Sequence, residues 1–123
     1  MAKDRSKWAA AFYADAAGRK PVKDFLRDLH ASDPEAAATV RRKFRIFDEL
    51  GWNDSVANGL LKHVEEKIFE IKVKKGQPRV LGFAWRKLFI AASAELKQQD
   101  YLDPQTIKDA QDRREDWIQR HGN

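Results

Sequence analysis

Residues 61–97 read LKHVEEKIFEIKVKKGQPRVLGFAWRKLFIAASAELK, and this stretch decides the fold. Two runs rich in apolar residues, Lys67–Lys74 and Arg79–Trp85, flank the turn residues 75–78, which include Gly76 and Pro78. A third run, Leu88–Ala94, follows a short basic dipeptide. Because β-branched and aromatic residues bounded by Gly and Pro favour strands, the stretch predicts three consecutive antiparallel strands.

Positive charge is concentrated in the same stretch. From Lys62 to Lys97 there are nine Lys or Arg and four Asp or Glu, and the rest of the chain holds fifteen of each sign. The pI of 9.6 and the net charge of +5 favour an anionic partner: nucleic acid first, an acidic protein second and anionic lipid third. A basic domain that is merely soluble is the alternative.

Composition limits the class of protein further. A chain of 123 residues with 42% hydrophobic and 11% aromatic residues is expected to fold as one globular domain, residues 1–123. We expect no membrane helix, because no apolar run approaches the roughly 18 residues that one needs, and no signal peptide at Met1. The absence of cysteine excludes disulfides and thiolate chemistry, and a reducing cytoplasm is the expected compartment.

Two helices are predicted before residue 61. The first begins at Pro21, and its apolar residues recur at offsets of three, four and seven, namely Val22, Phe25, Leu26 and Leu29. The second begins at 32–35, where either Ser32 caps the helix with Glu35 closing a capping box, or Asp33 caps it with Pro34 in the first turn. Its expected buried face comprises Ala37, Val40, Phe44 and Phe47, and Gly51 is the expected end.

The remaining segments complete the expected architecture. Trp8–Tyr13 is a first strand or, because of its alanines, a helical turn, and Trp52–Gly59 is expected to be a loop. Asp103-Pro104 begins a last helix. The prediction is an α+β domain, a twisted, mainly antiparallel sheet of about four strands with two N-terminal helices and a C-terminal helix, the helices on one sheet face.

Strand alternation predicts two chemically different sheet faces. If the loop closes so that Lys74 lies opposite Arg79, the residues that share a cationic face are Glu70, Lys72, Lys74, Arg79, Leu81 and Phe83. The other face is apolar and meets the helices. Lysine and arginine neutralise phosphates and aromatic rings stack on unpaired bases, so the cationic face suits RNA, although charged strand residues also commonly face solvent without any ligand.

Common catalytic motifs are missing. The chain has no Walker loop, GxGxxG, HExxH or nucleophile elbow, and its three histidines are not in ligand spacing, so a metal site is not expected. RNA cleavage without a metal is possible because the 2′-hydroxyl is the nucleophile. Like charges around Lys72 would favour its neutral amine as a base, Arg79 could clamp the phosphate, and Lys97 could assist the leaving oxygen.

Several short motifs resemble those of the HigB-like, phage-derived branch of the RelE toxin superfamily. They are Gly18-Arg19-Lys20-Pro21-Val22, Leu61-Lys62-His63, Ile68-Phe69-Glu70-Ile71-Lys72 and Arg79-Val80-Leu81, in the same order across nearly the whole chain. The resemblance implies the toxin of a toxin–antitoxin module, a ribosome-dependent endoribonuclease that cleaves mRNA without metal or organic cofactor. It also implies a small antitoxin as partner, typically a helix-turn-helix DNA-binding protein.

The resemblance assigns roles to individual residues. It implies that Lys72, Arg79 and Lys97 are catalytic. The residues expected to bind RNA are Lys74, Lys75, Phe83, Arg86, Lys87 and Tyr101. Two departures from the family pattern are Glu70, where active members often carry lysine, and Ala94–Gln98, where one lysine of a family pair is absent. These departures favour the alternative, a catalytically weak or inactive RNA-binding, ribosome-binding or protein-interaction module on the same fold.

Overall fold

The computed structural model describes residues 7–73, 78–96 and 100–123 of the chain. Its order of elements, given with their bounds, is β1 (Ala9–Phe12), α1 (Pro21–Ser32), α2 (Pro34–Ala57), β2 (Leu61–Glu65), β3 (Ile68–Ile71), β4 (Arg79–Trp85), β5 (Leu88–Glu95) and α3 (Pro104–His121). The strands form one sheet in the order β1-β5-β4-β3-β2, in which β1 runs parallel to β5 and the other pairs are antiparallel. No helix in the described ranges combines the length and apolarity that crossing a membrane requires.

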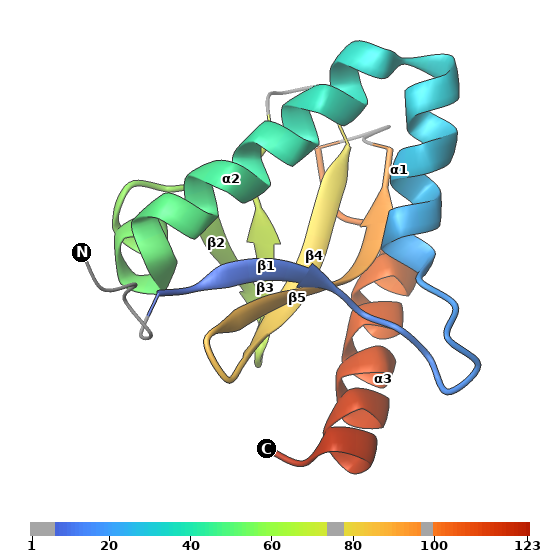
Figure 1. The fold of residues 1–123 in the computed structure, drawn as a ribbon, viewed down its shortest axis with the longest axis vertical. Helices are drawn as coiled ribbons and strands as arrows, with labels where there is room; N and C mark the ends of the chain where they lie inside the picture. The colour runs from blue at the N-terminus through green and yellow to red at the C-terminus, as the bar shows by residue number, and fades with distance from the viewer. Residues whose placement is uncertain (1–6, 74–77, 97–99) are drawn as a thin grey trace.

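The predicted fold class, α+β with a mainly antiparallel sheet, two N-terminal helices and a C-terminal helix, is confirmed (Figure 1). The predicted strand Trp8–Tyr13 exists as β1, and the three later strands lie close to their predicted bounds. The sheet has one strand more than predicted, because Leu61–Glu65 pairs with β3 as an edge strand. This strand was not predicted because its side chains do not alternate between polar and apolar: Leu61 is buried, but Lys62 and His63 are both exposed.

Local capping explains where the helices begin. Of the two predicted starts for α2, the structure has the second: Asp33 accepts a hydrogen bond from the Ala36 N–H at 3.1 Å, with Pro34 in the first turn. Asp103 caps α3 in the same way by accepting from the Gln105 N–H at 2.9 Å. Both helices therefore begin where an Asp-Pro pair satisfies the otherwise unpaired N–H groups.

The interpretation of Trp52–Gly59 as a loop is wrong for most of its length. Gly51 has a φ of 77° and interrupts α2, but helix resumes and continues to Ala57. The cause is tertiary: the Trp52 ring packs edge-on against Phe69 at 4.9 Å and lies 5.2 Å from Trp8. Burying this ring against the sheet outweighs the turn-forming residues around it.

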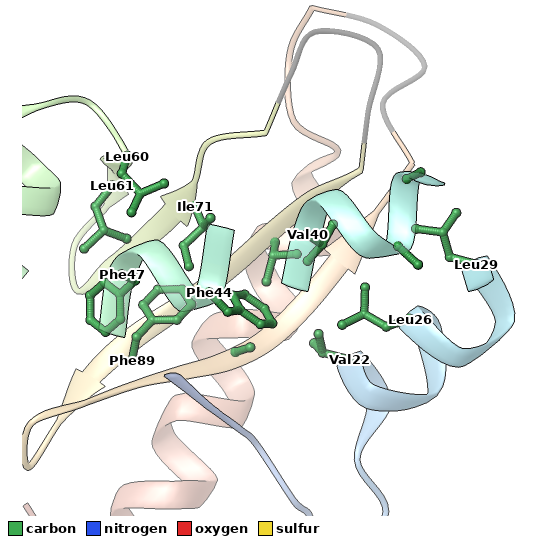
Figure 2. Close-up of a cluster of buried hydrophobic side chains, with 14 residues drawn as sticks. Val22, Leu26, Leu29, Val40, Phe44, Phe47, Leu60, Leu61, Ile71 and Phe89 are labelled. Atoms are coloured by element: carbon green, nitrogen blue, oxygen red, sulfur yellow. The ribbon is translucent and has the colours of Figure 1, made fainter. Parts of the chain in front are cut away.

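The core has two parts because both faces of the sheet are covered. On one face, α1 and α2 pack on Ile71, Val80 and Phe89. Figure 2 shows Ile71 and Phe89 of the sheet beside Val40, Phe44 and Phe47 of α2. On the opposite face, α3 covers a second cluster, which contains Ile68, Leu81, Phe83, Ile90 and Ala92. The expectation that all helices lie on one face is therefore wrong, since Figure 1 places α3 across the sheet from α2.

A β-bulge determines which residues of β5 face α3. Leu81 pairs with Ser93 and Gly82 pairs with Ala91, so Ala92 is an extra residue in β5. The bulge shifts the alternation by one residue and directs Ser93 toward α3, where its hydroxyl donates to the Thr106 carbonyl at 2.8 Å. It also places Glu95 opposite Arg79, and Glu95 accepts from the Asp103 N–H at 3.0 Å. The bulge thereby fastens the beginning of α3 to the sheet.

Candidate functional site

The candidate site lies at the end of the sheet where β3 ends and β4 begins. Ile71 pairs with Val80, so continuing the register by one position sets Lys72 opposite Arg79. The predicted register had Lys74 in that place and is wrong by two residues. The shift preserves the predicted face of each side chain, because strand side chains alternate with a period of two. It makes Lys72 and Arg79 cross-strand neighbours.

Lys72 and Arg79 differ sharply in their surroundings. Lys72 is exposed, and its backbone N–H donates to the Leu60 carbonyl at 2.8 Å, which fixes the chain at this point. The Arg79 side chain is only 13% exposed: its Nε lies 3.6 Å from Glu70 Oε2, and its Nη2 donates to the Asp100 carbonyl at 2.9 Å. Lys72 is therefore available to a ligand, whereas the Arg79 guanidinium already interacts with the Glu70 carboxylate and the Asp100 carbonyl.

The segment before α3 completes this end of the sheet. Arg79 holds the carbonyl of Asp100, and the next residue, Tyr101, is 65% exposed. Tyr101 was predicted to contact RNA, and the structure attaches its segment to Arg79. We define the sheet-end site as Glu70, Lys72, Arg79, Glu95 and Tyr101. Lys74, Lys75 and Lys97, which were also predicted as site residues, lie outside the described residues.

The predicted role of Phe83 in base stacking is wrong. Its side chain is fully buried in the cluster beneath α3, together with Leu81 and Ile68. Strand alternation correctly placed Phe83 on the same face as Leu81. The sequence did not reveal that α3 packs on that face and removes the ring from solvent.

Arg86 and Lys87 lie at the opposite end of the sheet. Arg79 is the first of the seven residues of β4 and Arg86 follows the last, so the two lie roughly 23 Å apart at the rise of a strand. Arg86 donates to the carbonyls of His121 and Asn123 and lies 4.5 Å above the Trp85 ring, so it fastens the end of α3. Lys87 is exposed and lies 5.3 Å from the centroid of the Trp8 ring. Neither residue belongs to the sheet-end site.

Arg86 and Lys87 form the two-residue turn between β4 and β5. Both have positive φ, 47° and 66°, as the type I′ hairpin turn requires. Residues other than glycine and asparagine rarely adopt this conformation. Contacts of Arg86 with the end of α3 hold the turn in place. This interaction gives Arg86 a structural role, and the RNA contacts predicted for Arg86 and Lys87 stay a prediction.

A second polar cluster joins the end of β1 to α3. Tyr13 is buried and its hydroxyl donates to Asp116 Oδ2 at 2.6 Å, and Arg120 pairs with the same oxygen at 2.7 Å. Burial and the bond to Asp116 raise the pKa of Tyr13 above its usual range. The hydrogen bonds from Arg120 and Tyr13 hold the pKa of Asp116 below its usual range. This cluster anchors α3 and contains none of the predicted site residues.

Two further observations concern ligands. A cleft of about 540 Å³ lies between the turn at Glu66–Ile68 and the side of α3 that carries Arg114, away from the sheet-end site. Within the described ranges, no group of three or more His, Cys, Asp or Glu side chains is arranged to hold a metal ion. Among the residues of the sheet-end site, Lys72 and Tyr101 are the exposed ones, and Tyr101 follows the residue whose carbonyl Arg79 binds.

Comparison with known proteins gives no assignment of family: no family model matches the chain, and no curated protein is significantly similar to it.

Proposed function

We propose that this protein is the toxin of a toxin–antitoxin module of the RelE/HigB type, acting in the cytoplasm as a metal-independent, ribosome-dependent endoribonuclease that cleaves mRNA. The observation that carries the proposal is the end of the β3–β4 ladder: the last pair is Ile71 with Val80, and one further position of the same register sets an exposed Lys72 opposite Arg79. Cross-strand neighbours have Cβ atoms about 5 Å apart, so the Lys72 amine and the Arg79 guanidinium can reach the same phosphodiester. The order of the helices and strands agrees with the resemblance of the sequence motifs.

The chemistry would proceed by attack of the RNA on its own backbone. Lys72 acts as the general base that takes the proton of the 2′-hydroxyl, and the 2′-oxygen bonds to phosphorus while the bond to the 5′-oxygen breaks. The departing 5′-oxygen takes a proton from an acid such as Lys97, so the products are a 2′,3′-cyclic phosphate and a 5′-hydroxyl. Arg79 contributes positive charge next to the phosphate and fixes the segment that carries Tyr101.

A catalytically weak or inactive RNA-binding or ribosome-binding module is the second candidate. The Glu70–Arg79 ion pair favours it, because Glu70 neutralises the cation expected to clamp the phosphate and both side chains are largely buried. In this case Lys72 and Tyr101 would hold RNA without cleaving it. In either case an antitoxin of the helix-turn-helix class is the proposed protein partner.

Pulsed expression in a bacterial host, followed by primer extension on translated messages, tests the first candidate. We expect growth arrest and new 5′ ends within coding regions, both lost in Lys72→Gln. Lys67→Gln, which removes the same charge from the β2–β3 turn, is the matched control and should cleave normally. Growth arrest with intact transcripts would reject cleavage in favour of the binding module, and equal cleavage by both variants would reject the sheet-end site.

A further inference from the structure

The outer surface of the α1–α2 hairpin carries a second concentration of positive charge. Its residues, which we call the helical basic face, are Lys23, Arg27, Arg41, Arg42 and Arg45, and all five are exposed. In the sequence the surrounding acidic residues balance this charge, so the net count for the helices is neutral. In the structure the side chains of these five cations are exposed on the outer surface of the hairpin.

Helix periodicity brings these cations together. Val40, Phe44 and Phe47 of α2 point toward the sheet in Figure 2, so the residues between them, Arg41, Arg42 and Arg45, point away from the core. On α1, Lys23 and Arg27 are one turn apart on the exposed side. A groove of about 250 Å³ between the two helices is lined by Lys23, Asp24, Arg27, His30 and Arg41, so Arg41 of α2 lies near Lys23 and Arg27 of α1.

Most of this charge is not neutralised within the hairpin. Asp24 and Asp28 both contact Arg27, at 3.1 and 3.7 Å from its guanidinium nitrogens. Among the ion pairs found in the described residues, none involves Lys23, Arg41, Arg42 or Arg45. Four cations are therefore presented to solvent on one surface.

The surroundings of the helical basic face identify the class of ligand. In the described part of the chain the large exposed apolar residues are Val56, Leu96 and Tyr101, and none belongs to α1 or to the first half of α2. Stable protein interfaces use buried aromatic or apolar anchors, and membrane-surface helices insert apolar residues. A surface of arginines without such anchors fits phosphate groups, which arginine binds through its fork of donors.

We infer that the helical basic face binds the sugar–phosphate backbone of a double-helical nucleic acid, independently of base sequence. Unpaired strands are normally held by aromatic rings on which bases stack, and the exposed surface of this hairpin provides none. A duplex instead presents regularly spaced phosphates to a rigid surface. The face shares no residue with the sheet-end site, so this inference does not depend on RNA cleavage.

Fluorescence anisotropy with a blunt-ended RNA duplex of mixed sequence, titrated from about 50 to 200 mM salt, tests the inference. Arg41→Gln/Arg45→Gln should bind more weakly, and its slope of log affinity against log salt should be smaller by about two, one for each phosphate contact removed. The control Lys67→Gln/Lys108→Gln removes two charges outside the helical basic face, one in the β2–β3 turn and one on α3. Its slope of log affinity against log salt should equal that of the parent protein.

Equal slopes for the two double variants would overturn the inference. Poly-L-glutamate serves as the second probe: if it binds as tightly as the duplex and shows the same loss in Arg41→Gln/Arg45→Gln, the face is a site for acidic protein and the inference fails. Circular dichroism verifies that each variant is folded. Lys23→Gln/Arg42→Gln provides an independent pair of substitutions, for which the same reduction in slope is expected.

Discussion

Arg79 and Glu70 form an ion pair 3.6 Å long on the sheet face that carries α3, and their side chains are 13% and 8% exposed. The pair couples the candidate site to the stability of the fold. Arg79 also holds the Asp100 carbonyl, so the cation links β3, β4 and the segment that leads into α3. A substitution of Arg79 can therefore lower both the stability of the protein and its activity on RNA, and the two effects have to be measured separately.

Arg79→Ala is expected to lower the free energy of unfolding by about 2–4 kcal/mol, because it leaves the Glu70 carboxylate buried without its partner. The double substitution Glu70→Leu/Arg79→Leu should recover most of that loss, since no buried charge remains. Urea unfolding of the three proteins measures both effects. Unchanged stability in Arg79→Ala would show that the pair contributes little, and loss of RNA affinity in the stable double variant would isolate the functional role of Arg79.

Phe83→Ala is expected to cost about 3–5 kcal/mol of stability, because it opens a cavity beneath α3. Phe83→Leu retains most of the apolar volume and should fold with a smaller loss. RNA affinity of the folded Phe83→Leu protein, measured below its unfolding temperature, should equal that of the parent. Weaker binding by this variant would mean that the ring reaches RNA despite its burial.

Gly82→Ala is expected to destabilise the protein by about 3 kcal/mol or more through overpacking. A Cβ at this position would collide with the backbone carbonyl of Ile90 and would lie 2.6 Å from Cζ of Phe89. Thermal unfolding of Gly82→Ala measures the loss. Gly59→Asn is the control, since nothing lies within 4 Å of a Cβ at Gly59 and asparagine tolerates its positive φ, so it should unfold close to the parent temperature.

Ionisation of Tyr13 should destabilise the protein at high pH. Its pKa lies above the ordinary value of 10.0 because of burial and the bond to Asp116. A group with a raised folded pKa contributes stability that is present below its unfolded pKa and is lost as the pH rises through the folded value. The free energy of unfolding should therefore fall above about pH 10, and Tyr13→Phe should remove this part of the pH dependence.

The absorbance of tyrosinate provides a direct check on Tyr13. The chain has two tyrosines, so in Tyr101→Phe the signal reports Tyr13 alone. Its titration midpoint should lie above 10 in the folded protein and should drop toward 10 in urea. A folded-state midpoint at or below 10 would contradict the hydrogen bond to Asp116.

The sequence by itself determined the elements that depend on local chemistry. Asp-Pro pairs at residues 33–34 and 103–104 begin α2 and α3, because a carboxylate cap and a proline in the first turn favour helix wherever they occur. Strand alternation placed Phe83 on the correct face, because neighbouring side chains of a strand point in opposite directions. These features need only a few consecutive residues.

Tertiary structure alone decided what each surface meets. Alternation could not show that α3 covers Phe83, or that Glu70 pairs with a largely buried Arg79, because both depend on contacts between segments far apart in the chain. The same limit applies to the helical basic face, because the net charge of the two helices is neutral in the sequence and only the fold brings Lys23 and Arg27 of α1 beside Arg41 of α2. Local patterns specify which side chains share a face, and packing energy between elements specifies which of those faces remain open to a ligand.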